Sequence, residues 1–204
     1  HRLPVAQDSH AMPHPTQPAA PRARLTLALL ALLSALAFMD RQILAVLLVP
    51  VKAEFGLSDL QVGLVTGLGF ALTFGLIGVP LGRVADRRER RTLVAWCRGI
   101  GGALAALGAT ASGAWTLAFT RMGGAISDAG GGPASMSMIA DLYPPESRSR
   151  AMSVFAMGAS AGSLMALIGG AWFAQRHGWR ATLAAIGLVT LAMAPLVTAL
   201  FARL

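Results

Sequence analysis

The sequence predicts an all-α membrane protein of six transmembrane helices, and three features lead to this prediction. Of the 204 residues, 55% are hydrophobic and only 13% are charged, whereas soluble domains carry about a quarter charged residues. The mean hydropathy is +0.61. Apolar segments of about 20 residues, the length that a membrane-spanning helix needs, alternate with short basic segments. The lipid bilayer is therefore the expected surroundings of most of the chain.

The expected spans are residues 25–50, 60–82, 92–112, 114–142, 149–174 and 180–202. The fourth is long for a span, so its last turns are expected to project into water. Residues 1–24 contain five prolines and no apolar run, a composition typical of a disordered segment. They are expected to form a disordered cytoplasmic tail, and residues 25–204 are expected to form the six-helix transmembrane bundle.

The distribution of basic residues predicts the orientation of the bundle. Of the 17 Lys and Arg residues, 11 fall in the tail, after the second and fourth spans, and after the sixth span, while three fall on the opposite side and three lie inside spans. Cytoplasmic loops are the ones enriched in Lys and Arg. A multi-pass protein of the cell (inner) membrane with both termini in the cytoplasm is expected. No basic face lies outside the loops, which argues against nucleic-acid binding.

Four charged residues lie well inside the expected spans. Asp40 and Arg41 interrupt the first span, and Arg121 and Asp128 interrupt the fourth. A charge at the bilayer centre costs roughly 2.5–3.5 kcal/mol on insertion scales. Adjacent residues on a helix do not face each other, so Asp40 and Arg41 need separate partners on other helices. Arg121 and Asp128 are seven residues apart and share one face.

The two intramembrane acids occupy matching positions. Asp40 lies 15 residues after Leu25, and Asp128 lies 14 residues after Ala114. This correspondence predicts two inverted three-helix repeats with the polar site at their interface. The site is either a substrate or proton site, or a buried ion-pair network that only locks the helices together. In the first case, a buried carboxylate near arginines can load and release a proton as the cavity changes access.

Two further polar features are interpreted as structural. Arg98 lies only six residues into the third span, so its long side chain is expected to extend toward the lipid headgroups. Ser127 and Ser137 can form hydrogen bonds between helices, and such contacts usually serve packing.

Glycines in the fourth and fifth spans predict close helix contacts. Gly158 and Gly162 form a small-xxx-small step that allows two backbones to approach. The run Gly130-Gly131-Gly132-Pro133 lowers helix stability. It either breaks or bends the fourth span beside Asp128 or simply provides a packing surface.

The loop after the second span resembles a motif of the major facilitator superfamily. It reads Gly82-Arg83-Val84-Ala85-Asp86-Arg87-Arg88-Glu89-Arg90-Arg91, similar to G-x-x-x-D-R-x-x-R-R at the same place in that family. The segment Asp141-Leu142-Tyr143-Pro144-Pro145-Glu146-Ser147-Arg148 is also similar to the superfamily's loop after the fourth span. The resemblance implies a cytoplasmic gate. Its charge network, which would latch the outward-open state, would comprise Asp86, Arg90, Asp141 and Arg148.

Within the superfamily, the chain resembles the spinster-type branch, whose members are proposed transporters of lipids or organic anions. Met39-Asp40-Arg41-Gln42-Ile43 and the segment 51–58 carry this resemblance. It implies secondary active, proton-coupled transport of a small organic or lipid-like solute. Asp40 would couple to protons, and Arg121 and Asp128 would lie in the cavity with Arg41. The branch's span 4 pattern, R-x-G-x-G-x-G-E-A, is here altered: Ala125 and Ser127 replace two glycines, and the acid is the shorter Asp128.

The superfamily normally has twelve spans in two halves, and this chain carries six. The resemblance therefore implies either a piece of a longer transporter or a dimer of halves, so that transport needs a missing C-terminal half or a second copy. The first is favoured, because a lone half would expose the four intramembrane charges to lipid.

Other functions are weighed against transport. A non-transporting membrane sensor or assembly protein, or an inactive truncated relic of a transporter, stays open as an alternative. The sequence contains no H-E-x-x-H, G-x-S-x-G or cysteine-nucleophile pattern, so an enzyme is not expected. No catalytic residue, metal site or cofactor is expected.

Overall fold

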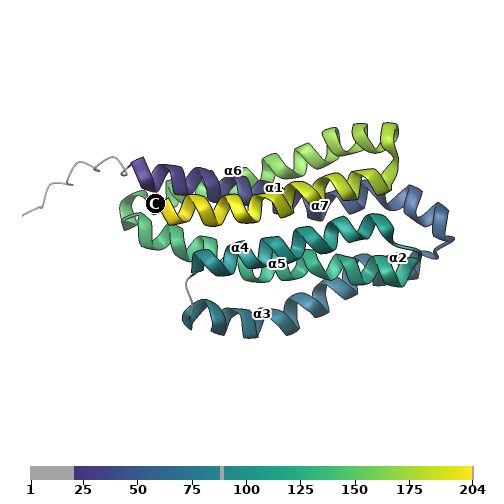
Figure 1. Cartoon of the computed structure of the whole chain (residues 1–204), viewed down its shortest axis with the longest axis horizontal. Coiled ribbons are helices and arrows are strands. Elements are labelled where there is room, and N and C mark those ends of the chain that lie inside the picture. The colour runs from purple at the N-terminus through teal and green to yellow at the C-terminus, as the bar shows by residue number, and fades with distance from the viewer. Residues whose placement is uncertain (1–20, 88–89, 204) are drawn as a thin grey trace, which may run out of the picture.

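A computed structural model describes residues 21–87 and 90–203, and for residues 65, 85–87, 90, 91 and 200–203 it describes the backbone path alone. Long helices lie side by side along the longest axis of the molecule (Figure 1). In chain order the elements are α1 (Pro21–Phe55), α2 (Asp59–Gly63), the π-helix η1 (Leu64–Leu68), α3 (Gly69–Arg87), α4 (Arg90–Leu107), the 3₁₀ turn η2 (Gly108–Thr110), α5 (Ala114–Leu142), α6 (Pro145–Met165), the π-helix η3 (Ala166–Gly170) and α7 (Ala171–Arg203).

Within the described residues, these elements form six helical passes along the bundle, as predicted. The passes are α1, then α2–η1–α3, α4–η2, α5, α6–η3 with the start of α7, and the remainder of α7. Gly178 separates the last two, because its φ of 82° lies in the left-handed region that favours glycine. The chain turns back there and runs along the bundle again (Figure 1).

Length and composition alone identify fewer spans among the described residues. Four stretches are long and apolar enough to cross a membrane: Pro21–Phe55, Asp59–Val84, Thr92–Thr110 and Pro145–Ala199. The last contains the turn at Gly178 and supplies two passes. α5 is not among the four, because its glycines and charged residues lower its hydropathy, yet it packs along α3 and α4 like the other passes.

The helix contacts repeat in two halves. α1 packs against α6 as α3 packs against α5, and α4 packs against α5 as α7 packs against α1. Exchanging the first, second and third passes with the fourth, fifth and sixth therefore maps these contacts onto each other. The first pass begins at one end of the bundle and the fourth at the other (Figure 1). The predicted pair of inverted three-helix repeats is confirmed.

One end of the bundle, here called the basic end, holds the start of α1, the end of α3, the α5–α6 connection and the C-terminal end (Figure 1). The described arginines Arg22, Arg24, Arg83, Arg148 and Arg150 belong to this end. The opposite end holds the α1–α2 and α4–α5 connections and the turn in α7 (Figure 1).

Glycine packing brings α1 and α6 into close contact. A Cβ added at Gly158 would overlap the carbonyl oxygen of Ala31, and a Cβ at Gly162 would overlap that of Ala35. The predicted small-xxx-small contact is therefore present. The triple glycine of α5 neither breaks nor ends the helix, since α5 continues through Pro133 to Leu142.

An aromatic and ionic cluster joins three passes at the opposite end, and the sequence analysis did not anticipate it. Arg180 donates to Glu54 at 2.7 Å and to the carbonyl oxygens of Ala109 and Ala111 at 2.9 and 2.8 Å. The Trp179 indole also donates to Glu54. This opposite-end cluster ties α1, η2 and α7 together.

We predict that Arg180→Lys will lower the Tm of the purified bundle by about 2–4 °C. Lysine keeps the positive charge, but it lacks the planar fork with which Arg180 reaches Glu54 and two carbonyls at once. Scanning fluorimetry in detergent measures the change. Arg176→Lys is the matched control, because Arg176 contacts only the Trp172 ring among the contacts described for it. An equal shift in the two variants would contradict the prediction.

Candidate functional site

Charged side chains form a layer between two apolar clusters of the core. The cluster nearer the basic end contains Leu33 and Ile139, and the other contains Leu47 and Leu117. Asp40 lies between these clusters along α1, on the face of that helix that is buried in the bundle. The charged layer, as named here, comprises Asp40, Arg41, Arg98, Arg121 and Asp128.

Asp40 and Arg121 form the most direct ion pair of the charged layer. Nη1 of Arg121 lies 3.0 Å from Oδ1 of Asp40, and Nη2 donates to the Asp40 carbonyl oxygen at 2.8 Å. Both residues are buried, with 8% and 7% of their surface exposed. Gly124 leaves room for the pair, because a Cβ there would lie 3.2 Å from Oδ2 of Asp40. The guanidinium thus holds both the side chain and the backbone of α1.

Arg41 and Asp128 form a looser pair between the same two helices. Nη1 of Arg41 lies 3.9 Å from Oδ2 of Asp128, beyond hydrogen-bonding distance. The Arg41 side chain is 46% exposed and lies over the ring of Phe70, 4.5 Å from its centroid. Arg41 is therefore the accessible cation of the charged layer. The separate partners expected for Asp40 and Arg41 are present.

The interpretation of Arg98 as a headgroup-seeking residue is wrong. Its guanidinium points into the bundle and is only 3% exposed. It donates to Oγ of Ser127 at 3.0 Å and lies 3.9 Å from Oδ1 of Asp128. Position near the end of a span gives the depth of the Cα atom, not the direction of a long side chain.

A cavity of about 300 Å³ opens beside the charged layer between α1, η1, α3 and α5. Arg41 and Arg121 provide its charged lining, and Leu44, Leu48 and Phe70 provide apolar surface. Such a cavity can hold a solute that has one charged or polar group and an apolar body.

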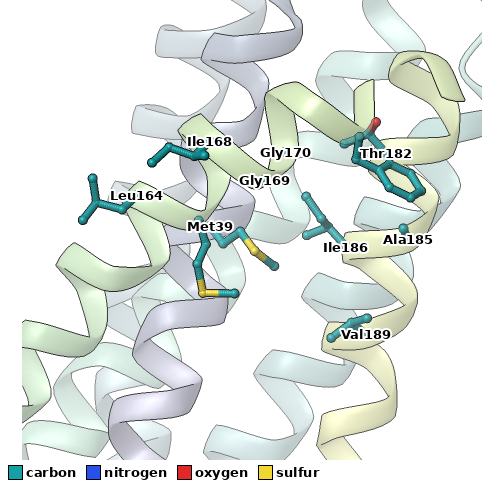
Figure 2. A pocket seen from close by; sticks show the side chains of 11 residues that line it. Met39, Leu164, Ile168, Gly169, Gly170, Thr182, Ala185, Ile186 and Val189 are labelled. Carbon is teal, nitrogen blue, oxygen red and sulfur yellow. The ribbon is translucent and has the colours of Figure 1, made fainter. Parts of the chain in front are cut away.

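A larger cavity of about 520 Å³ lies elsewhere, between α1, α6, η3 and α7 (Figure 2). Met39, Leu164, Ile168 and Ile186 line it, so its walls are almost wholly apolar. Thr182 contributes a hydroxyl that is already bonded to the Gly178 carbonyl. We place the candidate site at the smaller cavity, because the intramembrane charges line that one.

The expected gate loop is described only in part. Gly82 lies on α3, but the side chains of Asp86, Arg87, Arg90 and Arg91 fall outside the described residues.

In the second loop, Arg148 donates to the carbonyl oxygen of Ala140 at 2.8 Å and so binds the C-terminal end of α5. Asp141 lies one residue further along α5. Tyr143 directly follows the helix, and burial raises the pKa of its phenol.

Two curated proteins are similar to this chain in sequence. It is 35% identical over 176 residues to an MFS-type efflux pump of Mycolicibacterium smegmatis, covering 86% of this chain and 41% of the pump. It is 29% identical over 153 residues to protein spinster homolog 1 of Homo sapiens, covering 73% of this chain and 28% of that protein. The chain thus spans less than half the length of these relatives.

Solved structures match the fold over nearly the whole chain. A bacterial homologue of the human lysosomal transporter Spinster, inward-facing and unoccupied, superposes with a TM-score of 0.80 at 29% identity, covering 90% of this chain and 44% of the homologue. The occupied inward-facing form gives a TM-score of 0.78 at 30% identity, covering 88% and 44%. The family model of the Major Facilitator Superfamily matches residues 30–204. The chain is therefore a membrane-embedded member of the Major Facilitator Superfamily, of the spinster-like kind.

Proposed function

We propose that the chain forms the N-terminal half of a secondary active, proton-coupled transporter of a small organic or lipid-like solute. The charged layer is the observation that carries this proposal. Intramembrane charges are costly and mark pathways for ions and substrates, and here Arg41 and Arg121 of the layer line a cavity. The relatives named as an efflux pump and as spinster proteins support the same function.

In this proposal Asp40 is the proton-coupling residue. Within the charged layer, Arg121 is the cation that bonds Asp40 directly, so protonation of Asp40 would release that guanidinium into the neighbouring cavity. Arg41, Arg121 and Asp128 would form the solute site. Protonation of Asp40 and binding of a solute anion at Arg121 would then be coupled, because each breaks the same ion pair.

The charge of the layer favours a solute with an anionic group. Three arginines face two aspartates, which leaves one positive charge in excess. An anion bound by Arg41 would neutralise this excess, and the apolar lining from Leu44, Leu48 and Phe70 would hold the rest of the molecule.

The basic end is proposed to face the cytoplasm of the cell (inner) membrane, following the excess of Arg in its loops. The gate loop Gly82–Arg91 and the Asp141–Arg148 segment would then act on the cytoplasmic side.

A second six-helix half is proposed to complete the transporter. Large apolar side chains are exposed on α3 and α6, the second elements of the two repeats, as at Leu76 (74%), Val79 (61%) and Met157 (68%). Two repeat-related faces of this kind fit contact with a C-terminal half or a second copy.

We predict that Asp40→Asn will abolish solute-driven proton movement in the intact protein that contains this chain. Proteoliposomes hold a pH-sensitive dye, and two probes with the same tail and opposite permanent charge are added: octanesulfonate and octyltrimethylammonium. Octanesulfonate should drive proton flux and accumulate with an imposed pH gradient in the unaltered protein. The variant should do neither, because the amide that replaces the carboxylate cannot be protonated in the range tested. Mass spectrometry measures the accumulated probe.

Asp59→Asn is the matched control, because Asp59 is exposed and pairs with Lys52 outside the charged layer. It should keep full flux. Octanesulfonate uptake that does not depend on the pH gradient and persists in Asp40→Asn would overturn the proton-coupled function.

A further inference from the structure

Arg98 reaches the charged layer from α4, a helix that contributes no residue to the cavity beside Arg41. Its Nη1 bonds Ser127 and lies 3.9 Å from Asp128, and its side chain is 4% exposed. Its buried Nε finds no hydrogen-bond partner among the described residues. Buried polar groups are normally satisfied, so this arginine is held in place without being fully bonded.

Glycines on α4 and α5 leave room for the Arg98 side chain and for its partner Ser127. A Cβ added at Gly131 would lie 3.0 Å from Nη2 of Arg98, so the guanidinium rests directly on the α5 backbone. A Cβ at Gly101 would lie 2.7 Å from that of Ser127. The lack of a side chain at Gly101 on α4 therefore leaves room for Ser127. The absence of side chains at both glycines thus gives Arg98 and Ser127 their positions.

Asp128 is shared by two unlike cations. Arg41 and Arg98 each lie 3.9 Å from a different oxygen of its carboxylate. Arg41 is 46% exposed and can turn toward a bound molecule, whereas Arg98 is enclosed between α4 and α5. If Arg41 moved away, an Asp128 carboxylate without Arg98 would be left in the membrane with no ion-pair partner among the described residues, which is strongly unfavourable.

We infer that Arg98 is a positioning residue that holds Asp128 as a carboxylate from behind, so that Arg41 can leave it and bind a solute anion. The inference concerns how the solute site is released, and in that respect it rests on the proposed function. The pairing of Arg98 with Asp128 is independent of transport and is tested first.

Dicyclohexylcarbodiimide, which reacts with protonated carboxyl groups in apolar surroundings, tests the pairing in the purified intact protein. Mass spectrometry of peptides measures labelling of Asp128, with Asp40 as the internal control held by Arg121. Asp128 should be labelled about tenfold more in Arg98→Met than in the unaltered protein or Arg98→Lys, since an opposite charge within about 4–6 Å favours the charged carboxylate. Equal labelling of Asp128 in all three proteins would overturn the inference.

The double variant Arg98→Met/Asp128→Asn covers the case in which Arg98→Met does not accumulate in the membrane. If the loss arises from the stranded carboxylate, removing that charge should restore accumulation, which supports the pairing. Failure of the double variant to accumulate would show that Arg98 acts apart from Asp128, and would overturn the inference.

Uptake of octanesulfonate by the intact protein in proteoliposomes tests the release of Arg41. In Arg98→Met, the fraction of Asp128 that stays ionised has Arg41 as its remaining ion-pair partner among the described residues, so KM should rise about tenfold while the maximal rate per folded protein changes little. Arg98→Lys should restore KM. A lower maximal rate with unchanged KM would contradict the positioning role. No uptake by the unaltered protein would instead count against the proposed function, and the labelling result would still decide the pairing.

Discussion

Replacing Arg121 with methionine is expected to destabilise the bundle by about 3–5 kcal/mol, the cost of breaking a buried ion pair by removing one partner. Methionine fills similar space but cannot donate. The Asp40 carboxylate and the Asp40 carbonyl oxygen would both lose their short bonds to the guanidinium. Because Asp40 is 8% exposed, water cannot replace these bonds without opening the contact between α1 and α5.

The measurement is the amount of monodisperse protein after solubilisation, followed by its thermal unfolding in detergent. Asp40→Asn/Arg121→Met is the matched double variant, because it removes both charges together. It should recover part of the lost stability, as removal of both partners is far less costly than removal of one. Single and double variants of equal stability would show that the pair is not an energetic unit.

Adding one methyl group at Gly162 is expected to cost about 1–3 kcal/mol through overpacking. The Cβ of Gly162→Ala would overlap the Ala35 carbonyl, which belongs to the backbone of α1 and cannot rotate away. α1 and α6 would have to separate along their whole contact. This movement would also shift α1 at Asp40, five residues from Ala35.

Gly169→Ala is the control, because a Cβ at Gly169 meets nothing within 4 Å. Alanine is a better helix former than glycine by about 1 kcal/mol, so this variant should be neutral or stabilising. Thermal unfolding in detergent compares the two. A Tm of Gly162→Ala equal to that of Gly169→Ala would contradict the close packing of α1 on α6.

The sequence alone predicts the passes and most of the charged layer, because both depend on local patterns. Apolar length fixes a span, and a charge inside a span is visible at once, as at Asp40 and Asp128. The sequence does not reveal which cation pairs with which acid. That choice depends on helix rotation and on glycines such as Gly124 that make room for one partner.

The sequence did not predict the contacts of Arg98 or the opposite-end cluster, for different reasons. Arg98 was interpreted from its depth in the span. Its actual position between Gly131 and Ser127 of α5 depends on how α4 packs on α5, which the sequence does not show. Glu54 and Arg180 are 126 residues apart and meet because the end of α1 and the turn in α7 lie at the same end of the bundle. No local pattern links residues so distant in the chain.

Because Asp40 and Arg41 are adjacent, α1 carries two charged side chains that point in different directions. Consecutive residues leave a helix about 100° apart around its axis. Asp40 is bound to Arg121 by short hydrogen bonds, whereas Arg41 lies at a longer distance from Asp128. A force that pulls Arg41 sideways therefore acts as a torque on α1, and the first bond to resist this torque is the one that joins Asp40 to Arg121.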